Sequence, residues 1–233
     1  MGFSLFYFSC ITNTTTKGMT FMQSYRVLEM LNQGRIEELK DILRDEIYQD
    51  ALKTRRGGNR RYSAMKKYFG YVKTARTVCQ KPSIIEFEGK AVTSFCNAYS
   101  LALTSEPCGA IPLFTEDDGN YPNVGRLVVR EGEPQQIDIH KAIAEAKSKG
   151  YRLTKTEVNG NNFMMHYNGA YFRLGLIDAT YSIIDNGEIA IAYHNGKNVS
   201  PIVLENEIGV CLILPVKCDE EFIKNNGITV IEA

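Results

Sequence analysis

The feature that most constrains the fold is a change in the spacing of apolar residues, which occurs twice along the chain. Apolar residues recur every three or four positions over 62–74, which predicts a helix, and alternate with polar ones over 85–104, which predicts strands. Helical spacing returns over 138–149, and strand patterns then continue to Val216. This order predicts an α+β domain of two helix-plus-strands halves. We expect helices 62–74 and 138–149 to lie side by side on one face of a shared sheet.

Short local signals place the ends of several elements. Asp138 suits the N-cap of the second helix because its carboxylate can accept a backbone N–H, and Gly150 suits the left-handed position after that helix. Both residues of an Asn-Gly pair tolerate positive φ, so such pairs predict hairpin turns. Three of them are expected to form such turns: Asn159-Gly160, Asn168-Gly169 and Asn195-Gly196.

The C-terminal half of the domain is predicted to hold one more helix and at least two strands. We expect the helix over 171–184 and a strand over 188–193. The last strand, 209–216, is apolar on both faces, which predicts a position in the middle of the sheet or one covered on both sides.

The residues before the domain predict a helical extension. The 24–50 stretch has helical spacing with an acidic opposite face, and Gly34 is expected to split it into two helices. The predicted organisation is a loosely ordered N-terminal arm (1–21), a helical extension with a basic linker (22–58), the main domain (59–217) and a C-terminal tail (218–233).

The composition argues against common catalytic and metal-binding classes. The six cysteines are scattered without a CxxC pair, and none of the three histidines lies near a cysteine, so neither a disulfide framework nor a zinc site is expected. No phosphate-binding, dinucleotide-binding or hydrolase motif occurs. We expect no catalytic residue, no metal and no cofactor. The acidic run Glu116-Asp117-Asp118 could bind a cation or form a solvated loop.

No stretch of the sequence resembles a transmembrane segment. The apolar run 3–11 is far too short to span a bilayer and has no basic residues before it, so it does not resemble a signal peptide. We therefore expect a cytoplasmic protein with no membrane partner.

Charge is balanced over the whole chain but strongly segregated in one segment. The chain has 27 basic and 27 acidic residues, yet the 53–81 segment contains ten basic residues and no acid. Basic side chains on a helix can neutralise DNA phosphates and release counterions, which gives affinity without sequence preference. The alternative is a solvated face that pairs with the acidic helix 36–50. The candidate DNA-binding residues are Arg55, Arg56, Arg60, Arg61, Lys66, Lys67, Lys73 and Arg76.

Several motifs resemble the bacterial DNA polymerase III beta sliding clamp. The C-terminal ones are Asn168-Gly169-Ala170-Tyr171-Phe172, the strand 188–193, Pro201-Ile202-Val203-Leu204 and the closing Leu212-Ile213-Leu214-Pro215-Val216-Lys217. They follow the order of the clamp's final segment.

The earlier motifs of this resemblance are shorter. They are Glu88-Gly89, Asn97-Ala98-Tyr99-Ser100-Leu101-Ala102 and Tyr121-Pro122-Asn123-Val124, with Asn97 where the family has Asp and Ser100 where it has Arg. Together the motifs imply one clamp-like domain over about 61–217, whereas a clamp subunit of the family has three.

The resemblance implies a non-catalytic protein that binds the backbone of duplex DNA, replication partners, or both. Partner proteins of clamps insert a short apolar motif beside the final strand, and the matching positions here are Pro201, Leu212, Leu214, Pro215 and Val216. These five residues could instead be ordinary core residues. The alternative function is an interaction protein of a mobile element such as a phage, which binds or blocks another protein without contacting DNA. A homo-oligomer is compatible with both functions.

Overall fold

The computed structural model describes residues 21–36, 38–40, 42–43, 46, 57–71, 80–106, 108–109 and 111–233. The chain divides into two compact units, Met1–Ile47 and Tyr48–Ala233. Each unit is described by itself.

The first unit contains the helix α2 (Phe21–Asn32). The helix ends in a turn in which Gly34 has a φ of +70°, and helical backbone resumes at Ile36. A left-handed backbone at this point suits glycine because glycine has no Cβ to clash. The predicted division at Gly34 is therefore confirmed.

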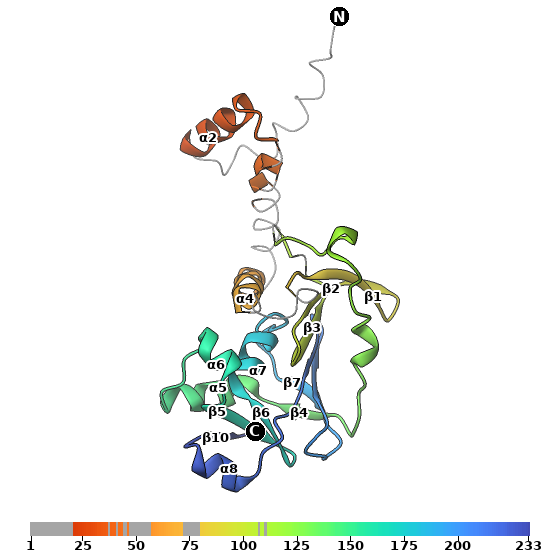
Figure 1. Cartoon of the computed structure of the whole chain (residues 1–233), viewed down its shortest axis with the longest axis vertical. Helices are drawn as coiled ribbons and strands as arrows, with labels where there is room; N and C mark the ends of the chain where they lie inside the picture. Colours follow the sequence, from red (N-terminus) through yellow and green to blue (C-terminus); the bar gives the residue numbers. More distant parts are fainter. Residues whose placement is uncertain are drawn as a thin grey trace, which may run out of the picture. The chain divides into compact units, whose positions relative to one another are not determined.

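The second unit is built on a seven-stranded antiparallel sheet with the order β1-β2-β3-β9-β8-β7-β4. Its strands are β1 (Ser83–Phe87), β2 (Lys90–Cys96), β3 (Ser100–Thr104), β4 (Gln135–Ile137), β7 (Ala190–Tyr193), β8 (Ile202–Asn206) and β9 (Gly209–Ile213). The strand predicted over 209–216 ends earlier, at Ile213, and lies between β3 and β8 in the middle of the sheet, as expected. The protein is thus a mixed α+β protein with a large antiparallel sheet (Figure 1).

Apart from the edge strand β4, the sheet is symmetric about the pair β3–β9. The helix α4 (Gly58–Tyr71) precedes β1, β2 and β3, and the helix α7 (Leu174–Tyr181) precedes β7, β8 and β9. The third strand of each half pairs with the other, antiparallel, and α4 contacts α7. The described residues therefore contain two halves of the same design, each a helix followed by three strands.

The turns between the second and third strands show the same repetition. In the first half, the Asn97 side chain accepts the N–H groups of Tyr99 and Ser100, both at 2.7 Å. In the second half, the Asn206 side chain accepts the N–H groups of Ile208 and Gly209, at 2.9 and 3.2 Å. An asparagine side chain that bonds the backbone two and three residues later fixes a tight turn, and both halves use it at the equivalent place.

A second, three-stranded sheet has the order β10-β5-β6, with β5 (Phe163–Tyr167), β6 (Ala170–Arg173) and β10 (Thr229–Glu232). Strand β10 pairs parallel to β5, and α8 (Glu220–Asn225) precedes it. The 218–233 stretch, expected as a tail after the domain, thus forms a helix and a strand of this unit. Ile231 at its centre is fully buried, which explains why the stretch packs into the unit.

Helices and an irregular segment cover opposite faces of the large sheet. On one face lies the main core, with α4, α5 (Ile139–Ser148), α6 (Lys155–Asn159) and α7. On the other face, residues of 121–128 pack against Leu101, Leu103 and Leu212. The segment 121–130 crosses this face of the sheet and is called the crossing segment. Arg130 fixes it, because the Arg130 guanidinium donates to Glu205 at 2.6 and 2.8 Å and to Glu88 at 2.6 Å.

Several expected boundaries are wrong. The helix expected over 171–184 starts at Leu174, because Ala170–Arg173 is paired in a strand with β5. Asn159-Gly160 ends α6 and forms no hairpin, and Asn195-Gly196 lies in a longer loop between β7 and β8. Asn168-Gly169 does form the β5–β6 hairpin, with φ of +47° and +80°. The N-cap of α5 is confirmed, since Asp138 accepts the N–H of Lys141 at 2.9 Å.

The expectation that helices 62–74 and 138–149 lie side by side is confirmed only for the shared face of the sheet, since the helix that packs on α4 is α7. Helices α4 and α5 lie on the same side of the large sheet (Figure 1), and each contacts α7. The helix that repeats α4 in the second half is α7, whereas α5 comes before β5 and β6. Among the described residues, no helix is long and apolar enough to cross a membrane.

Candidate functional site

The helix α4 contains every candidate DNA-binding residue that lies in the described part of the chain. Arg60, Lys66 and Lys67 are exposed on it. Lys66 stands over the ring of Tyr62, with Nζ 4.4 Å from the centroid. The remaining candidates, Arg55, Arg56, Lys73 and Arg76, lie outside the described residues.

Arg61 does not belong to an exposed basic surface. Its side chain is 1% exposed, and its guanidinium donates to Glu106 Oε1 at 2.7 Å and to the carbonyl of Asp185 at 3.1 Å. Glu106 is equally buried. Arg61 therefore ties α4 to the end of β3, and a DNA phosphate cannot reach it. The sequence alone does not show that Arg61 is buried. Arg61 lies next to Tyr62, at the edge of the apolar stripe, and its burial depends on its distant partner Glu106.

Two further basic residues of the 53–81 segment also contact acids that are distant in sequence. Arg60 Nη2 lies 2.5 Å from Asp185 Oδ2, although its own side chain is 63% exposed. Lys81 Nζ lies 2.6 and 2.8 Å from the two oxygens of Asp118. The excess of basic residues in this stretch of sequence is thus partly balanced in space by acids from β3 and beyond.

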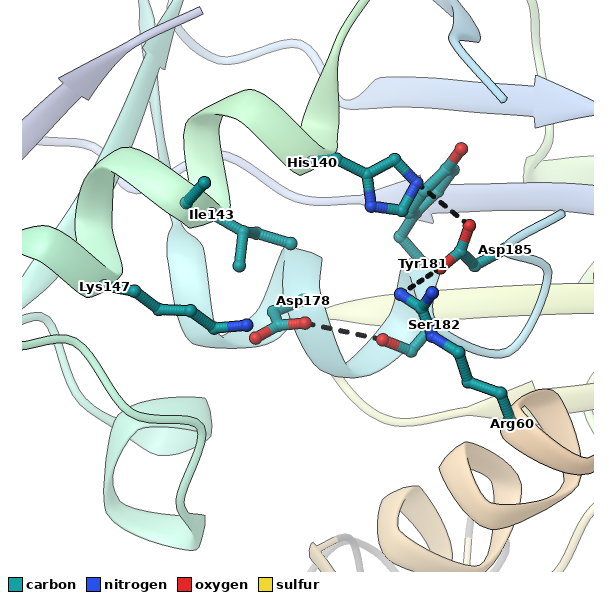
Figure 2. Close-up of a pocket in the computed structure, with 9 residues that line it drawn as sticks. Arg60, His140, Ile143, Lys147, Asp178, Tyr181, Ser182 and Asp185 are labelled. Carbon is teal, nitrogen blue, oxygen red and sulfur yellow. Dashed lines mark hydrogen bonds and ion pairs between the residues drawn. The ribbon is translucent and has the colours of Figure 1, made fainter. Parts of the chain in front are cut away.

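A pocket of about 120 Å³ opens where α4, α5 and α7 meet (Figure 2). The floor is formed by one stripe of α7 and the residues after it, and the walls by α5 and the start of α4. The lining residues are Arg60, His140, Ile143, Ala144, Lys147, Asp178, Tyr181, Ser182 and Asp185.

Asp185 at one end of the pocket is a buried carboxylate with three partners. Arg60 reaches it from α4, and His140 Nε2 lies 3.1 Å from Oδ1 from the side of α5 (Figure 2). The N–H of Gly187 donates to the same Oδ1 at 2.8 Å. Since the side chain is only 2% exposed, Arg60 and the N–H of Gly187 compensate the cost of removing its charge from water. Asp185 thereby joins α4 and α5 to the end of α7.

Asp178 at the other end of the pocket is less well compensated. The Tyr151 hydroxyl donates to its Oδ2 at 3.0 Å, and the Ser182 hydroxyl donates to Oδ1 at 3.4 Å. Burial raises the pKa of Asp178, while these hydrogen bonds and the charge of Lys147 oppose the rise. Burial also raises the pKa of Tyr181 to about 12. Figure 2 shows the Lys147 side chain extending from α5 toward Asp178.

Sequence analysis did not single out this pocket as a site, although its pattern was visible. His140, Ile143 and Lys147 are spaced three and four apart on α5, as Asp178, Tyr181 and Asp185 are on α7 and the turn after it. Such spacing puts side chains on one face of a helix. The spacing of the pocket residues on α5 is easily overlooked, because the apolar stripe of Ile139, Ala142 and Ala146 beside it is sufficient to predict the helix.

The residues of the expected partner groove are only partly gathered. Leu212 is buried under the crossing segment on the outer face of the sheet. Leu214 is 39% exposed and follows β9, where its N–H donates to Tyr99. Pro201 precedes Ile202, the partner of Ile213, so Pro201 lies across from Leu214. Val216 is bridged to Tyr171 of the smaller sheet. Pro201, Leu214 and Pro215 thus remain accessible, whereas Leu212 belongs to the core.

The acidic run 116–118 forms a short turn whose third carboxylate is engaged. Besides Lys81, Asp118 accepts the backbone N–H of Thr115 at 2.9 Å. Lys81 and these bonds lower the pKa of Asp118. In the part of the chain that the structure describes, no three His, Cys, Asp or Glu side chains gather as metal ligands would.

The second unit is uneven in charge. From 139 to 155 five basic side chains are exposed (Lys141, Lys147, Lys149, Arg152 and Lys155) against the single acid Glu145, whereas 219–233 holds four acids and one lysine.

No family model, curated protein or solved structure matches the chain. The arrangement of the described residues offers compensated charges and exposed cations on the helical side of the sheet.

Proposed function

We propose that the protein is a non-catalytic, sliding-clamp-like protein that binds the backbone of duplex DNA with the helical side of its large sheet. The clamp motifs of the sequence suggest a repeated helix-and-sheet unit. In clamps the helices of that unit face the duplex, and the sheet forms the outside.

The observation that carries this proposal is the symmetric sheet. Two halves, each a helix and three antiparallel strands, meet through β3 and β9, and both helices lie on one side. The equivalent Asn97 and Asn206 turns extend the correspondence to individual hydrogen bonds. A twofold repeat of helix and strands is what the resemblance implies, although the second helix of the repeat is α7 and not the expected helix 138–149.

Charge on the helical side supports the choice of partner. Arg60, Lys66 and Lys67 are exposed on α4, and this helix has no acid. Cations that neutralise phosphates release counterions, so binding weakens steeply with salt and shows little sequence preference.

A second candidate function is an interaction protein that uses the same scaffold to bind another protein without DNA. A specific observation favours it: every residue of α7 from Leu174 to Tyr181 is buried. The second repeated helix therefore presents no surface to a duplex. In addition, Arg61 and Arg60 on α4 are paired with acids of the unit itself.

One experiment separates the two candidates. The affinity of the full chain for a fluorescent 30-base-pair duplex is measured between 50 and 300 mM salt, with the mass of the free protein and complex determined in parallel. For three phosphate contacts, the slope of log K against log salt is expected to be about −2.7. The matched variant Lys66→Gln/Lys67→Gln should bring the slope to about −1, and a scrambled duplex should bind equally well.

Absence of salt-dependent binding to any duplex would refute the DNA-binding function and leave the interaction protein. Binding that depends on one duplex sequence would contradict the backbone mechanism.

A further inference from the structure

We propose that α5 forms the second wall of the DNA-backbone surface, with Lys147 as its principal phosphate contact. This inference rests on the proposed function and adds a residue, a helix and a geometry to it. The sequence pattern already placed the helices 62–74 and 138–149 on one face of the sheet, and the proposed surface is made by these two helices, α4 and α5.

Lys147 and the start of α4 lie at the same pocket. Lys147 and Arg60 both line it, from α5 and α4 respectively (Figure 2). The two helices therefore flank one depression, into which Arg60 extends toward Asp185 and Lys147 toward Asp178 (Figure 2). Both side chains reach solvent, Lys147 as an exposed residue and Arg60 with 63% of its side chain exposed.

Helical spacing adds a second side chain on each helix. Lys67 follows Arg60 by seven residues, so the two lie on one stripe of α4. On α5, Lys147 follows His140 by the same interval, and His140 also lines the pocket. Seven residues of helix span roughly 10 Å. The result is two cations on α4, Arg60 and Lys67, and one on α5, Lys147.

The floor between these cations does not oppose a phosphate strongly. Asp185 is compensated by Arg60 and the N–H of Gly187. Asp178 accepts hydrogen bonds from Tyr151 and Ser182. Burial of its carboxyl group raises its pKa. A phosphate at the mouth of the pocket meets the guanidinium of Arg60, which keeps further N–H donors available, and the ammonium of Lys147.

The burial of α7 makes α5 the necessary second wall. A duplex contacting only α4 would touch one narrow helix. Because α5 lies on the same side of the sheet and its continuation to Lys155 is rich in exposed cations, it supplies the missing positive surface. An acidic protein could also bind cations, but the symmetric sheet and the clamp motifs favour the duplex.

The test compares single lysine-to-glutamine variants of the full chain, each of which removes one positive charge. Lys147→Gln and Lys67→Gln remove proposed contacts. Lys141→Gln removes a charge from α5 one residue beyond His140, off the pocket stripe, and Lys224→Gln removes one from α8. All four side chains are exposed, and thermal unfolding confirms that each variant is folded.

Lys147→Gln and Lys67→Gln should each make the salt slope less steep by about 0.9 and lower affinity about fivefold to tenfold at 0.1 M salt. Lys141→Gln and Lys224→Gln should leave the slope within about 0.3 of the parent. If Lys67→Gln changes the slope and Lys147→Gln does not, the inference is wrong while the proposed function stands. Equal changes in Lys147→Gln and Lys141→Gln would show diffuse attraction and overturn it too. If the parent chain binds no duplex, both fail.

Discussion

The two helices that open the two halves, α4 and α7, occupy equivalent places but have opposite surroundings. Helix α4 keeps an exposed face with Lys66 and Lys67, whereas α7 has no exposed residue between Leu174 and Tyr181. The difference arises from what each half contains besides its repeat. The second half includes α5, α6 and the smaller sheet, which pack around α7, and these elements have no counterpart beside α4 among the described residues. A repeated scaffold can thus leave one helix partly exposed and enclose the other in the core.

A buried ion pair between Arg61 and Glu106 adds to the apolar contacts of Tyr62, Met65 and Tyr68 in holding α4. Removing one partner leaves the other charge buried without compensation. Arg61→Met should lower the free energy of unfolding by about 3–5 kcal/mol, measured by urea denaturation. The double variant Arg61→Met/Glu106→Leu should recover most of that loss. A loss below about 1 kcal/mol in the single variant would mean that Arg61 is solvated and that α4 is loosely attached.

The paired asparagine turns test how equal the halves are. Asn97→Ala removes the two backbone hydrogen bonds of the first turn, and we expect a loss of about 1 kcal/mol. Asn206→Ala should cost about 2 kcal/mol, because Asn206 Nδ2 also donates to the carbonyl of Ile184 at 2.9 Å. Both losses of unfolding free energy are measured from the shift of the urea denaturation midpoint, provided that the dependence of the free energy on urea concentration is the same in the parent and the variants. A larger loss in Asn97→Ala would break the comparison, since it would make the first turn the more important one.

A smaller difference concerns the connections between the first and second strands of each half. In the second half, the N–H of Gly196 donates to His194 Nδ1 at 3.2 Å, and Nε2 lies 3.3 Å from the carbonyl of Ser200. Burial lowers the pKa of His194, and Nδ1 acts as an acceptor only in the neutral ring. The unfolded chain therefore binds more protons below about pH 6.5, and stability falls as the pH falls below that value.

The expected loss between pH 7 and 5 is under about 1 kcal/mol, and His194→Gln should remove it. The first half has Glu88 and Gly89 at the equivalent turn, so Glu88→Gln serves as the control and should not change the slope below pH 6.5. An unchanged pH dependence in His194→Gln would assign the acid sensitivity to other groups.

Much of the fold followed from local patterns. The helix predicted over 138–149, its cap at Asp138, the Asn168-Gly169 hairpin and the central strand predicted over 209–216 are all found, the strand ending earlier at Ile213, since each is fixed largely by residues close in sequence. The start of α7 was not predicted, because Ala170–Arg173 fits a helix by itself and becomes a strand only by pairing with β5. Likewise, the integration of 218–233 depends on the parallel pairing of β10 with β5, for which no local signal exists.

For the site, the sequence by itself determined which side chains carry charge and how they are spaced along their helices. Only the tertiary structure decided which charges reach solvent. Arg61 and Lys67 belong to the same basic segment, yet one is enclosed against Glu106 and the other is exposed. The physical reason is that a charge is compensated by neighbours in space, and those neighbours come from strands and helices far away in the sequence. Charge segregation along a chain therefore predicts a binding surface only after its internal partners are known.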